Sequence, residues 1–296
     1  MKYKSMCRFS ILFVVAILTT LFYAPLASAA GILGSAESFA VLAAASITNT
    51  DSTTITGDVG VYPGTSITGA GSITLTGAYY YPPTNNPSVA LTAMNDLNKA
   101  YIGLAAMPYT KDYSGTDLGT LTLTPGVYKF DSSAQLTGTL TLNALGNPNA
   151  YWVFQIGSTL TTASSSSVVF ENLGSALGSA DGVFWQVGSS ATLGTSTAFE
   201  GNILADTSIT LGTSATILNG RALAGAVVSS GAVTMDGNTI KNVCPIGGPG
   251  SGGPGLSGGL VYTSSGAISP VPVPATMLLL GPGLVGLAAV RRRLKK

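Results

Sequence analysis

Four acidic residues in the second half of the chain carry side chains that could do acid–base chemistry. Paired carboxyl groups act as general acid and general base in enzymes that cleave polysaccharides, and the residues that could pair in this way are Glu171, Asp181, Glu200 and Asp206. None of them lies in a recognisable motif. The chain has no His, which excludes a Ser-His-Asp triad and a His-based metal site. We therefore predict that the protein is not an enzyme and has no catalytic, cofactor-binding or metal-binding residues.

The other charged residues of the same region have positions typical of structural roles. Asp58 and Asp131 follow predicted strands, where Asp commonly caps a turn. Glu37 and Asp96 are expected to serve the helix or the first coil. Arg221 is expected to be a structural partner of one of these acids.

Hydroxyl side chains offer a second kind of chemistry, because Ser or Thr alternates with an aliphatic residue in short segments throughout the chain. Successive side chains of a strand point to opposite faces. Inward-pointing Leu136, Leu160, Leu193, Ile209 and Val233 therefore turn their neighbours outward. Stacked segments of this kind form a regular, weakly charged ladder, which suits recognition of an ordered surface better than catalysis. The candidate binding residues are Thr54, Thr56, Ser66, Thr68, Thr74, Thr76, Thr137, Thr159, Thr161, Thr192, Ser208, Thr210 and Thr234.

Charge divides the chain into three parts. Basic residues cluster at the two ends, whereas residues 30 to 274 contain five basic and all twelve acidic residues, a net charge of −7. This balance excludes a nucleic-acid partner on electrostatic grounds.

Residues 1–29 are typical of a secretory signal peptide. A basic start precedes an apolar run from Phe9 to Leu18, and the small residues at 27–29 predict cleavage before Ala30. An uncleaved membrane anchor is the alternative. Cys7 lies within this segment, which leaves Cys244 as the one cysteine of the exported chain and excludes an intramolecular disulfide. Cys244 is either a buried thiol or a point of intermolecular pairing.

The C-terminal region divides into a linker and a tail. Residues 245–270 are rich in Gly, Pro and Ser and are expected to form a flexible linker. Residues 271–296 resemble the PEP-CTERM sorting signal of exported proteins in Gram-negative bacteria, with Val-Pro-Val-Pro at 271–274, an apolar span and an Arg-rich end. Val273 stands where that motif has Glu. The resemblance implies transient membrane insertion through the tail, processing by an enzyme of exosortase type, and a secreted, cell-surface or extracellular-matrix location.

Residues 30–244 form one domain, within the size that a single core supports. Apolar alternations separated by Gly, Ser and Asn predict strands across nearly all of it. The exception is 87–107, where apolar residues at intervals of three and four predict one amphipathic helix, with Asn86 or Ser88 capping its start and Pro108 ending it. The apolar stripe expected to pack against the strands is Val89, Leu91, Met94, Leu97, Tyr101, Leu104 and Ala105.

The hydroxyl-bearing segments recur at uneven intervals, which argues against a strict short repeat. Stacked coils are how one-sided repeats bury their apolar faces. We therefore predict a mostly β fold, an irregular β-helix or β-solenoid, with a β-sandwich as the alternative.

The domain resembles the bacterial and fungal ice-binding protein family. This resemblance implies a discontinuous, right-handed, three-faced β-solenoid with one long α-helix packed alongside, and adsorption to an ice crystal surface through one flat face. The motifs that carry it are 33–42 (LGSAESFAVL), 55–61 (ITGDVGV), 125–128 (PGVY), 153–158 (VFQIGS), 184–191 (FWQVGSSA), 201–205 (GNILA) and 219–223 (NGRAL).

Two functions remain open from the sequence. Adjacent coils lie about 4.7–4.9 Å apart and alternate side chains about 6.5–7 Å apart along a strand, and these distances resemble repeats of an ice lattice. Secreted, antifreeze-like ice binding is the first hypothesis. The second is a cell-surface or matrix protein that uses the same solenoid for adhesion, without ice activity.

Overall fold

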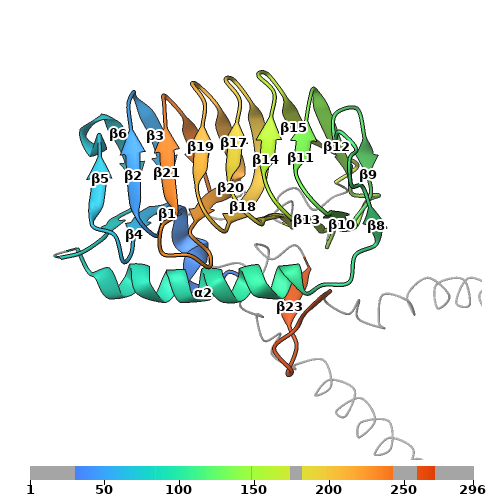
Figure 1. Ribbon diagram of the computed structural model, residues 1–296, viewed down its shortest axis with the longest axis horizontal. Coiled ribbons are helices and arrows are strands. Elements are labelled where there is room, and N and C mark those ends of the chain that lie inside the picture. Colours follow the sequence, from blue (N-terminus) through green and yellow to red (C-terminus); the bar gives the residue numbers. More distant parts are fainter. Residues whose placement is uncertain (1–30, 84, 148, 174–181, 243–258, 271–296) are drawn as a thin grey trace, which may run out of the picture.

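The computed structural model describes residues 31–83, 85–147, 149–173, 182–242 and 259–270. Its parallel strands stack into coils that enclose one apolar interior, and a single helix runs beside them along the length of the stack (Figure 1). The expected mostly β solenoid with a flanking helix is confirmed, and a β-sandwich is excluded, because nearly all strand pairs of the domain are parallel.

The first face is a sheet of seven parallel strands, which we call the Thr face. Its strands turn apolar members inward and the alternate residues toward solvent, and the inward residues are buried except in the terminal strand, where Ile67 is half-buried. Its strands, in spatial order, are β11 (Ala134–Leu136), β14 (Leu160–Thr162), β17 (Ala191–Leu193), β19 (Ile209–Leu211), β21 (Ala232–Met235), β2 (Ser46–Asn49) and β5 (Ser66–Thr68).

The second face, which we call the mixed face, follows the Thr face around a corner. Its outward residues include Thr, Ser, Val and Leu as well as charged side chains. Its strands are β9 (Thr122–Leu123), β12 (Thr139–Asn143), β15 (Ser167–Glu171), the first halves of β18 (Ala198–Ala205) and β20 (Thr216–Ala224), β22 (Thr239–Lys241), β3 (Thr53–Thr56) and β6 (Ile73–Thr76).

The strands β18 and β20 are long because each passes from the mixed face to the third face without a loop. The register between them shifts between Glu200 and Asn202. Gly201 makes this corner possible: its φ is +97°, and a Cβ there would lie 2.6 Å from Cβ of Val183.

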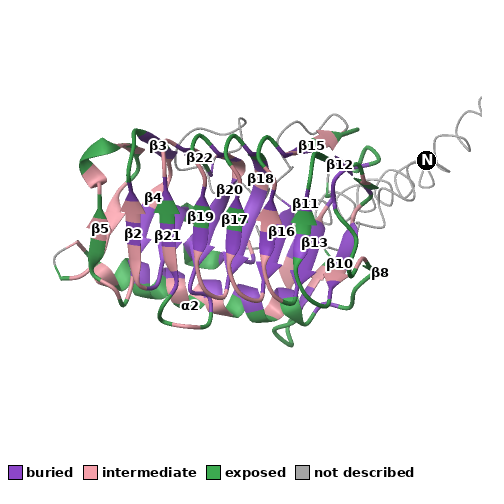
Figure 2. Ribbon diagram, turned by 45° about the horizontal axis from the view of Figure 1, so that its top comes forward, coloured by how far each residue is buried: buried purple, intermediate pink, exposed green. Residues whose placement is uncertain are grey.

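The third face is buried on both sides, since the solenoid interior lies beneath it and helix α2 (Pro87–Ala105) lies over it. Figure 2 shows the middle strands of this face in the colour of buried residues, whereas the strands at its two ends, Lys111–Asp112 and Tyr79–Tyr80, are exposed and half-buried. Its strands are β8 (Lys111–Asp112), β10 (Gly126–Phe130), β13 (Trp152–Ile156), β16 (Val183–Val187), the second halves of β18 and β20, β1 (Phe39–Ala43), β4 (Asp58–Val61) and β7 (Tyr79–Tyr80).

Helix α2 ends two residues before the predicted terminus, and only Leu97, Tyr101 and Leu104 of the predicted stripe are buried. Val89, Leu91 and Ala105, expected to face the strands, are exposed, and Met94 is half-buried. Small residues let the helix lie close to the sheet, an effect that a search for large apolar residues overlooks. Asn86 precedes the helix with φ of 41° and makes no side-chain capping hydrogen bond, so the predicted cap is wrong for Asn86. The buried residues are Ala90, Ala93, Leu97, Ala100, Tyr101 and Leu104.

Chain order and spatial order differ in this solenoid. The N-terminal strands β1 to β7 form the coils at one end, α2 runs to the other end, and the remaining coils return toward the start (Figure 1). β1 consequently lies between β20 and β4, paired with both in parallel. In each face, therefore, one strand of the N-terminal coils pairs with one strand of the C-terminal coils, and we call this junction the seam.

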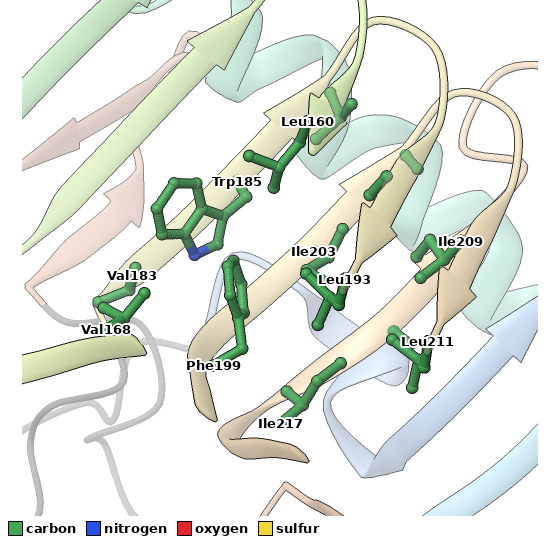
Figure 3. Close-up of a cluster of buried hydrophobic side chains, with 14 of the residues drawn as sticks. Leu160, Val168, Val183, Trp185, Leu193, Phe199, Ile203, Ile209, Leu211 and Ile217 are labelled. Carbon is green, nitrogen blue, oxygen red and sulfur yellow. The ribbon is translucent and has the colours of Figure 1, made fainter. Parts of the chain in front are cut away.

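Large side chains fill the interior where the coils stack (Figure 3). The rings of Phe154 and Trp185, opposite each other on β13 and β16, are stacked with centroids 3.9 Å apart. Trp185 also contacts Phe199 at 4.8 Å. The inward Leu160, Leu193, Ile209 and Val233 are fully buried, as strand alternation predicts.

The predicted linker is wrong for residues 259–270, which form a hairpin of two antiparallel strands, β23 (Leu260–Tyr262) and β24 (Ile268–Pro270). Leu260 and Ile268 are buried in the cluster under α2, and the hydroxyl of Tyr262 donates to the carbonyl of Ile32 at 3.0 Å. The many Pro and Gly residues of this segment indicated a linker, and the burial of Leu260 and Ile268 was therefore not predicted from the sequence. The predicted signal peptide (1–29), Cys244, the rest of the linker and the tail (271–296) lie outside the described residues.

Candidate functional site

One column of Thr side chains runs down the centre of the Thr face, with one residue from every strand. Cα pairing places these side chains directly opposite one another from strand to strand. Only the first position, Gln135, is not Thr. No residue of the column is charged. In spatial order the column is Gln135, Thr161, Thr192, Thr210, Thr234, Thr48 and Thr68.

Thr48 was not among the residues predicted from the sequence. It joins the column because β2 lies between β21 and β5 across the seam. The segment Ser46-Ile47-Thr48 has the same alternation as Ser66-Ile67-Thr68. That alternation is the signal that could have found it.

The hydroxyls of the central column make no hydrogen bond to the protein among the described residues. A second column, two residues earlier on each strand, differs. Thr159 donates to Oγ of Ser133 at 2.8 Å, and Oγ of Ser208 accepts from the N–H of Ala232 at 3.2 Å. The hydroxyls of Thr159 and Ser208 therefore bond along the sheet, whereas those of the central column are available to water.

The structure separates the predicted candidates. Ser66, Thr68, Thr159, Thr161, Thr192, Ser208, Thr210 and Thr234 lie on or beside the Thr face. Thr54, Thr56, Thr74 and Thr76 lie on β3 and β6 of the mixed face, and Thr137 lies in the turn between β11 and β12. Strand alternation decides which residues point outward but not which face they belong to.

The mixed face begins with a column of small residues and continues with an uneven one. Thr74, Thr54, Thr239 and Thr216 follow one another in register beside the corner. In the next column Thr56 lies opposite Lys241, followed by Leu218 and Glu200, and Val169 lies on β15 of the same face. Val169 is 40% exposed. Long and charged side chains therefore project from this face but not from the centre of the Thr face.

Two of the carboxylates considered for acid–base chemistry, Glu171 and Glu200, bond to neighbouring amides. Oε2 of Glu171 accepts from Nδ2 of Asn143 at 3.3 Å, and Oε2 of Glu200 accepts from Nδ2 of Asn219 at 3.1 Å, both on the mixed face. Asp206 follows β18 at the opposite end of that strand, and Asp181 lies outside the described residues. No group of three metal-binding side chains occurs in the described part of the chain.

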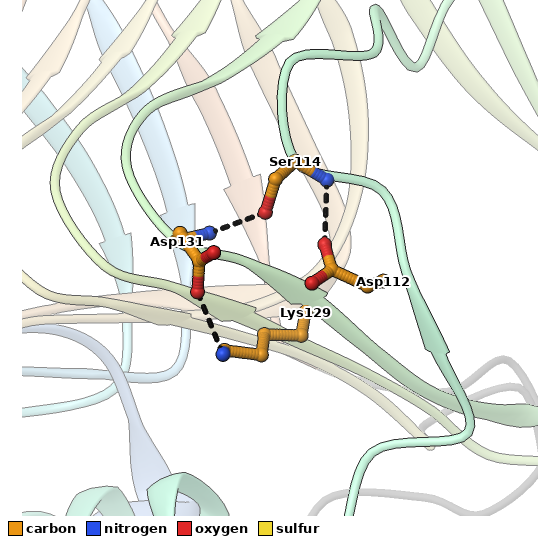
Figure 4. Close-up of polar contacts among 4 residues, drawn as sticks. All are labelled: Asp112, Ser114, Lys129 and Asp131. Carbon is orange, nitrogen blue, oxygen red and sulfur yellow. Dashed lines mark hydrogen bonds and ion pairs between the residues drawn. The ribbon is translucent and has the colours of Figure 1, made fainter.

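The acids assigned to structural roles bind main-chain or basic groups. Oδ1 of Asp58 accepts from the N–H of Ala78 at 2.9 Å, and Oδ2 of Asp96 accepts from the N–H of Ser35 at 2.8 Å. Asp131 forms an ion pair with Lys129 at 2.6 Å (Figure 4).

Arg221 is buried where the N-terminal coils meet the C-terminal ones. Its guanidinium donates to the carbonyl of Glu37 at 2.7 Å and to Oδ1 of Asn202 at 2.7 Å. Burial raises the pKa of the Glu37 carboxyl, and the charge of Arg221 opposes that rise. Arg221 is thus a partner of Glu37, through a hydrogen bond to the main-chain carbonyl of Glu37 and through its charge near the Glu37 carboxyl.

Asp236 fixes the corner between the Thr face and the mixed face. Its carboxylate accepts hydrogen bonds from the hydroxyls of Thr213 and Thr50, which come from the coils on either side. These hydrogen bonds lower the pKa of the Asp236 carboxyl. The corner is held by the ionised form of this side chain.

The described residues contain no helix with the length and apolar character of a membrane span.

A family model described as "Ice-binding-like" matches residues 41–241. An ice-binding protein of Nostoc sp. (strain HG1) is 47% identical over 272 residues, which cover 91% of this chain and 90% of the relative. An ice-binding protein of Colwellia sp. is 36% identical over 223 residues, with 71% of this chain and 82% of the relative covered.

Two solved structures of similar fold are those of ice-binding proteins from an Antarctic ascomycete and an Arctic yeast. The ice-binding protein of the Antarctic ascomycete Antarctomyces psychrotrophicus superposes with a TM-score of 0.64 at 40% identity, covering 71% of this chain and 97% of that protein. The ice-binding protein LeIBP of an Arctic yeast, described as having antifreeze activity, superposes with a TM-score of 0.63 at 29% identity, covering 73% and 96%.

Proposed function

The chain belongs to the ice-binding-like family, and from that premise we propose that it adsorbs to ice through the Thr face and so inhibits ice growth or recrystallisation. The observation that carries the choice of face is the central column, in which six Thr side chains stand in register. The proposed function is binding without catalysis.

The column has the regularity that adsorption to a crystal requires. Neighbouring strands lie about 4.8 Å apart and alternate residues about 6.5–7 Å apart along a strand. Backbone pairing fixes both distances. An ice lattice with matching spacings can therefore contact every coil in the same way. The affinity then comes from many weak contacts that act together.

Thr suits this role for two reasons. Its methyl group gives apolar contact while its hydroxyl orders water, and the hydroxyls of Thr192, Thr210 and Thr234 have no protein partner among the described residues. Its χ1 rotamer is also restricted, so little side-chain entropy is lost on adsorption.

The other two faces are less suited. The third face is covered by α2. The mixed face carries Lys241 and Glu200 in the same column as Thr56, and the exposed Val169 on β15. Charged groups hold their own hydration shells, which ice cannot accommodate without a desolvation cost.

Thermal hysteresis and inhibition of ice recrystallisation test this proposal. We expect activity in the purified parent chain, and a loss of more than half of it in Thr192→Tyr, because a bulky ring lifts the face from the crystal. Thr54→Tyr, an equally exposed position on the mixed face, is the matched control and should retain the parent activity.

Each outcome of this comparison has a defined meaning. Loss in Thr54→Tyr with full activity in Thr192→Tyr would move the site to the mixed face. No activity in the parent at high concentration would reject ice binding and favour the adhesion hypothesis. Circular dichroism of each variant excludes loss of fold as the cause.

We further propose that the protein is exported from a Gram-negative bacterium. The signal-like residues 1–29 support export, and the tail at 271–296 supports transient membrane insertion followed by processing of the exosortase type. The mass and N-terminal sequence of the protein recovered outside the cell test both steps. An intact N-terminus would contradict signal cleavage, and an intact C-terminus would contradict processing.

A further inference from the structure

The two ends of the solenoid differ in charge. At the end formed by β8, β9 and β11, residues 110–121 lie over the last regular strands: the N–H of Leu118 donates to the carbonyl of Gln135 and the N–H of Thr120 to that of Thr139, both at 2.8 Å. This end is also rich in charge. The charged residues are Lys111, Asp112, Asp117, Lys129 and Asp131, some of which appear in Figure 4.

The opposite end, formed by β5, β6 and β7, has no charged side chain between residues 59 and 95. We call it the uncharged end. Each of its three strands pairs with only one neighbour among the described residues, so each leaves one edge open. The apolar side chains of this last coil are only partly buried, although they pack on the interior: they are Ile67, Ile73, Leu75, Tyr79 and Tyr81.

Open strand edges are normally protected, because unpaired N–H and C=O groups are a template for pairing with another chain. Charged residues, above all Lys, are a common protection. The preceding coil carries two charged groups. They are Asp51, in a corner turn, and Asp58, whose carboxylate is engaged by the N–H of Ala78.

We propose that the uncharged end binds the uncharged end of a second copy of this chain. An end-to-end contact with two-fold symmetry brings identical surfaces together, and two surfaces without charge meet without like-charge repulsion. A contact between opposite ends would place the open strands against Lys111 and Asp112 instead. The assembly therefore stops at a dimer.

The dimer also extends the Thr face. β5 is the terminal strand of that sheet, and its two-fold mate can pair with it only in antiparallel orientation. The two seven-stranded sheets then form one surface. The contact involves three short strands, of three, four and two residues, so we expect it to be weak and reversible.

Sedimentation velocity of the full-length chain over a concentration series tests the proposal. Gly71, in the turn η2 (Ala70–Ser72) between β5 and β6, is suited to substitution because no atom lies within 4 Å of where its Cβ would be. We expect Gly71→Lys to weaken dimerisation about tenfold or more, by like-charge repulsion across the two-fold axis. Thr116→Lys adds the same charge at the other end and should leave the dimer unchanged.

A mixture of Gly71→Lys and Gly71→Glu provides a second readout, because opposite charges at the contact should restore dimers that neither variant forms alone. A monomeric parent at every concentration would overturn the proposal. An effect of Gly71→Lys no greater than that of Thr116→Lys would overturn the choice of end. Because ice activity is not measured, the result is independent of the proposed function.

Discussion

The main-chain N–H of Asn238 donates to the hydroxyl of Thr53, 3.0 Å away and 185 positions earlier in the chain. Both residues are buried at the corner between the Thr face and the mixed face. Thr53 in turn donates to Oδ1 of Asn49 at 2.7 Å, and Nδ2 of Asn238 donates to the carbonyls of Gly212 and Ala215, each at 2.9 Å. A chain of buried hydrogen bonds therefore joins coils from both ends of the sequence across the seam.

We expect Asn238→Ala to lower the free energy of unfolding by about 1–3 kcal/mol, because buried carbonyl groups lose their donor. Urea denaturation measures this change. Asn95→Ala, at an exposed position of α2, should change the free energy by no more than about 0.5 kcal/mol. Equal effects of the two substitutions would contradict a stabilising role for the corner network.

A second buried amide connects the helix to the solenoid. Nε2 of Gln155 on β13 donates to the carbonyls of Leu104 and Met107, at 2.7 and 2.8 Å. The carbonyl of Leu104 belongs to the last turn of α2, and that of Met107 follows the end of the helix, so the amide ties the exit of the helix to the sheet. Gln155→Leu should therefore destabilise the fold by about 1–3 kcal/mol, whereas Gln135→Leu, at an exposed position, should be near neutral in the same thermal or urea measurement.

Acid should destabilise the corner held by Asp236. Hydrogen bonds from Thr213 and Thr50 keep the pKa of its carboxyl below the ordinary value of 3.8. A group with a lowered folded-state pKa stabilises the protein above its unfolded pKa, and this contribution is lost as the pH falls through the folded value. We expect the melting temperature to be insensitive to this group from about pH 7 to 5 and to fall below about pH 4.

Asp236→Asn identifies the contribution of that carboxylate. The variant should be less stable than the parent at neutral pH, and the difference should shrink on acidification. A difference in melting temperature that stays constant from neutral to acidic pH would show that ionisation of Asp236 is irrelevant to the corner.

The position of a bulky substitution along the central column should also matter. Thr210 is flanked by three strands of the Thr face on each side, whereas Gln135 is in the terminal strand β11. A ring in the middle of a flat surface separates both halves from the crystal, but a ring at the edge leaves most of the surface in contact. Thermal hysteresis should therefore fall further in Thr210→Tyr than in Gln135→Tyr. Equal losses would indicate that few coils touch ice.

The sequence by itself determined the inside and the outside of the solenoid. Strand alternation is a local property with a period of two residues, so Leu160 and Ile209 are identified as buried without any knowledge of their neighbours. The helix, its approximate ends and the family were also predicted from local motifs, and they agree with the structure.

The tertiary structure decided which outward residues share a surface. Thr48 and Thr234 become neighbours only because β2 pairs with β21 across the seam, while Thr54, six positions after Thr48, lies around a corner on another face. Alternation does not record where the chain turns a corner or which distant coil stacks next. Those relationships depend on pairing between segments far apart in the sequence, and that pairing is what assembles the Thr face.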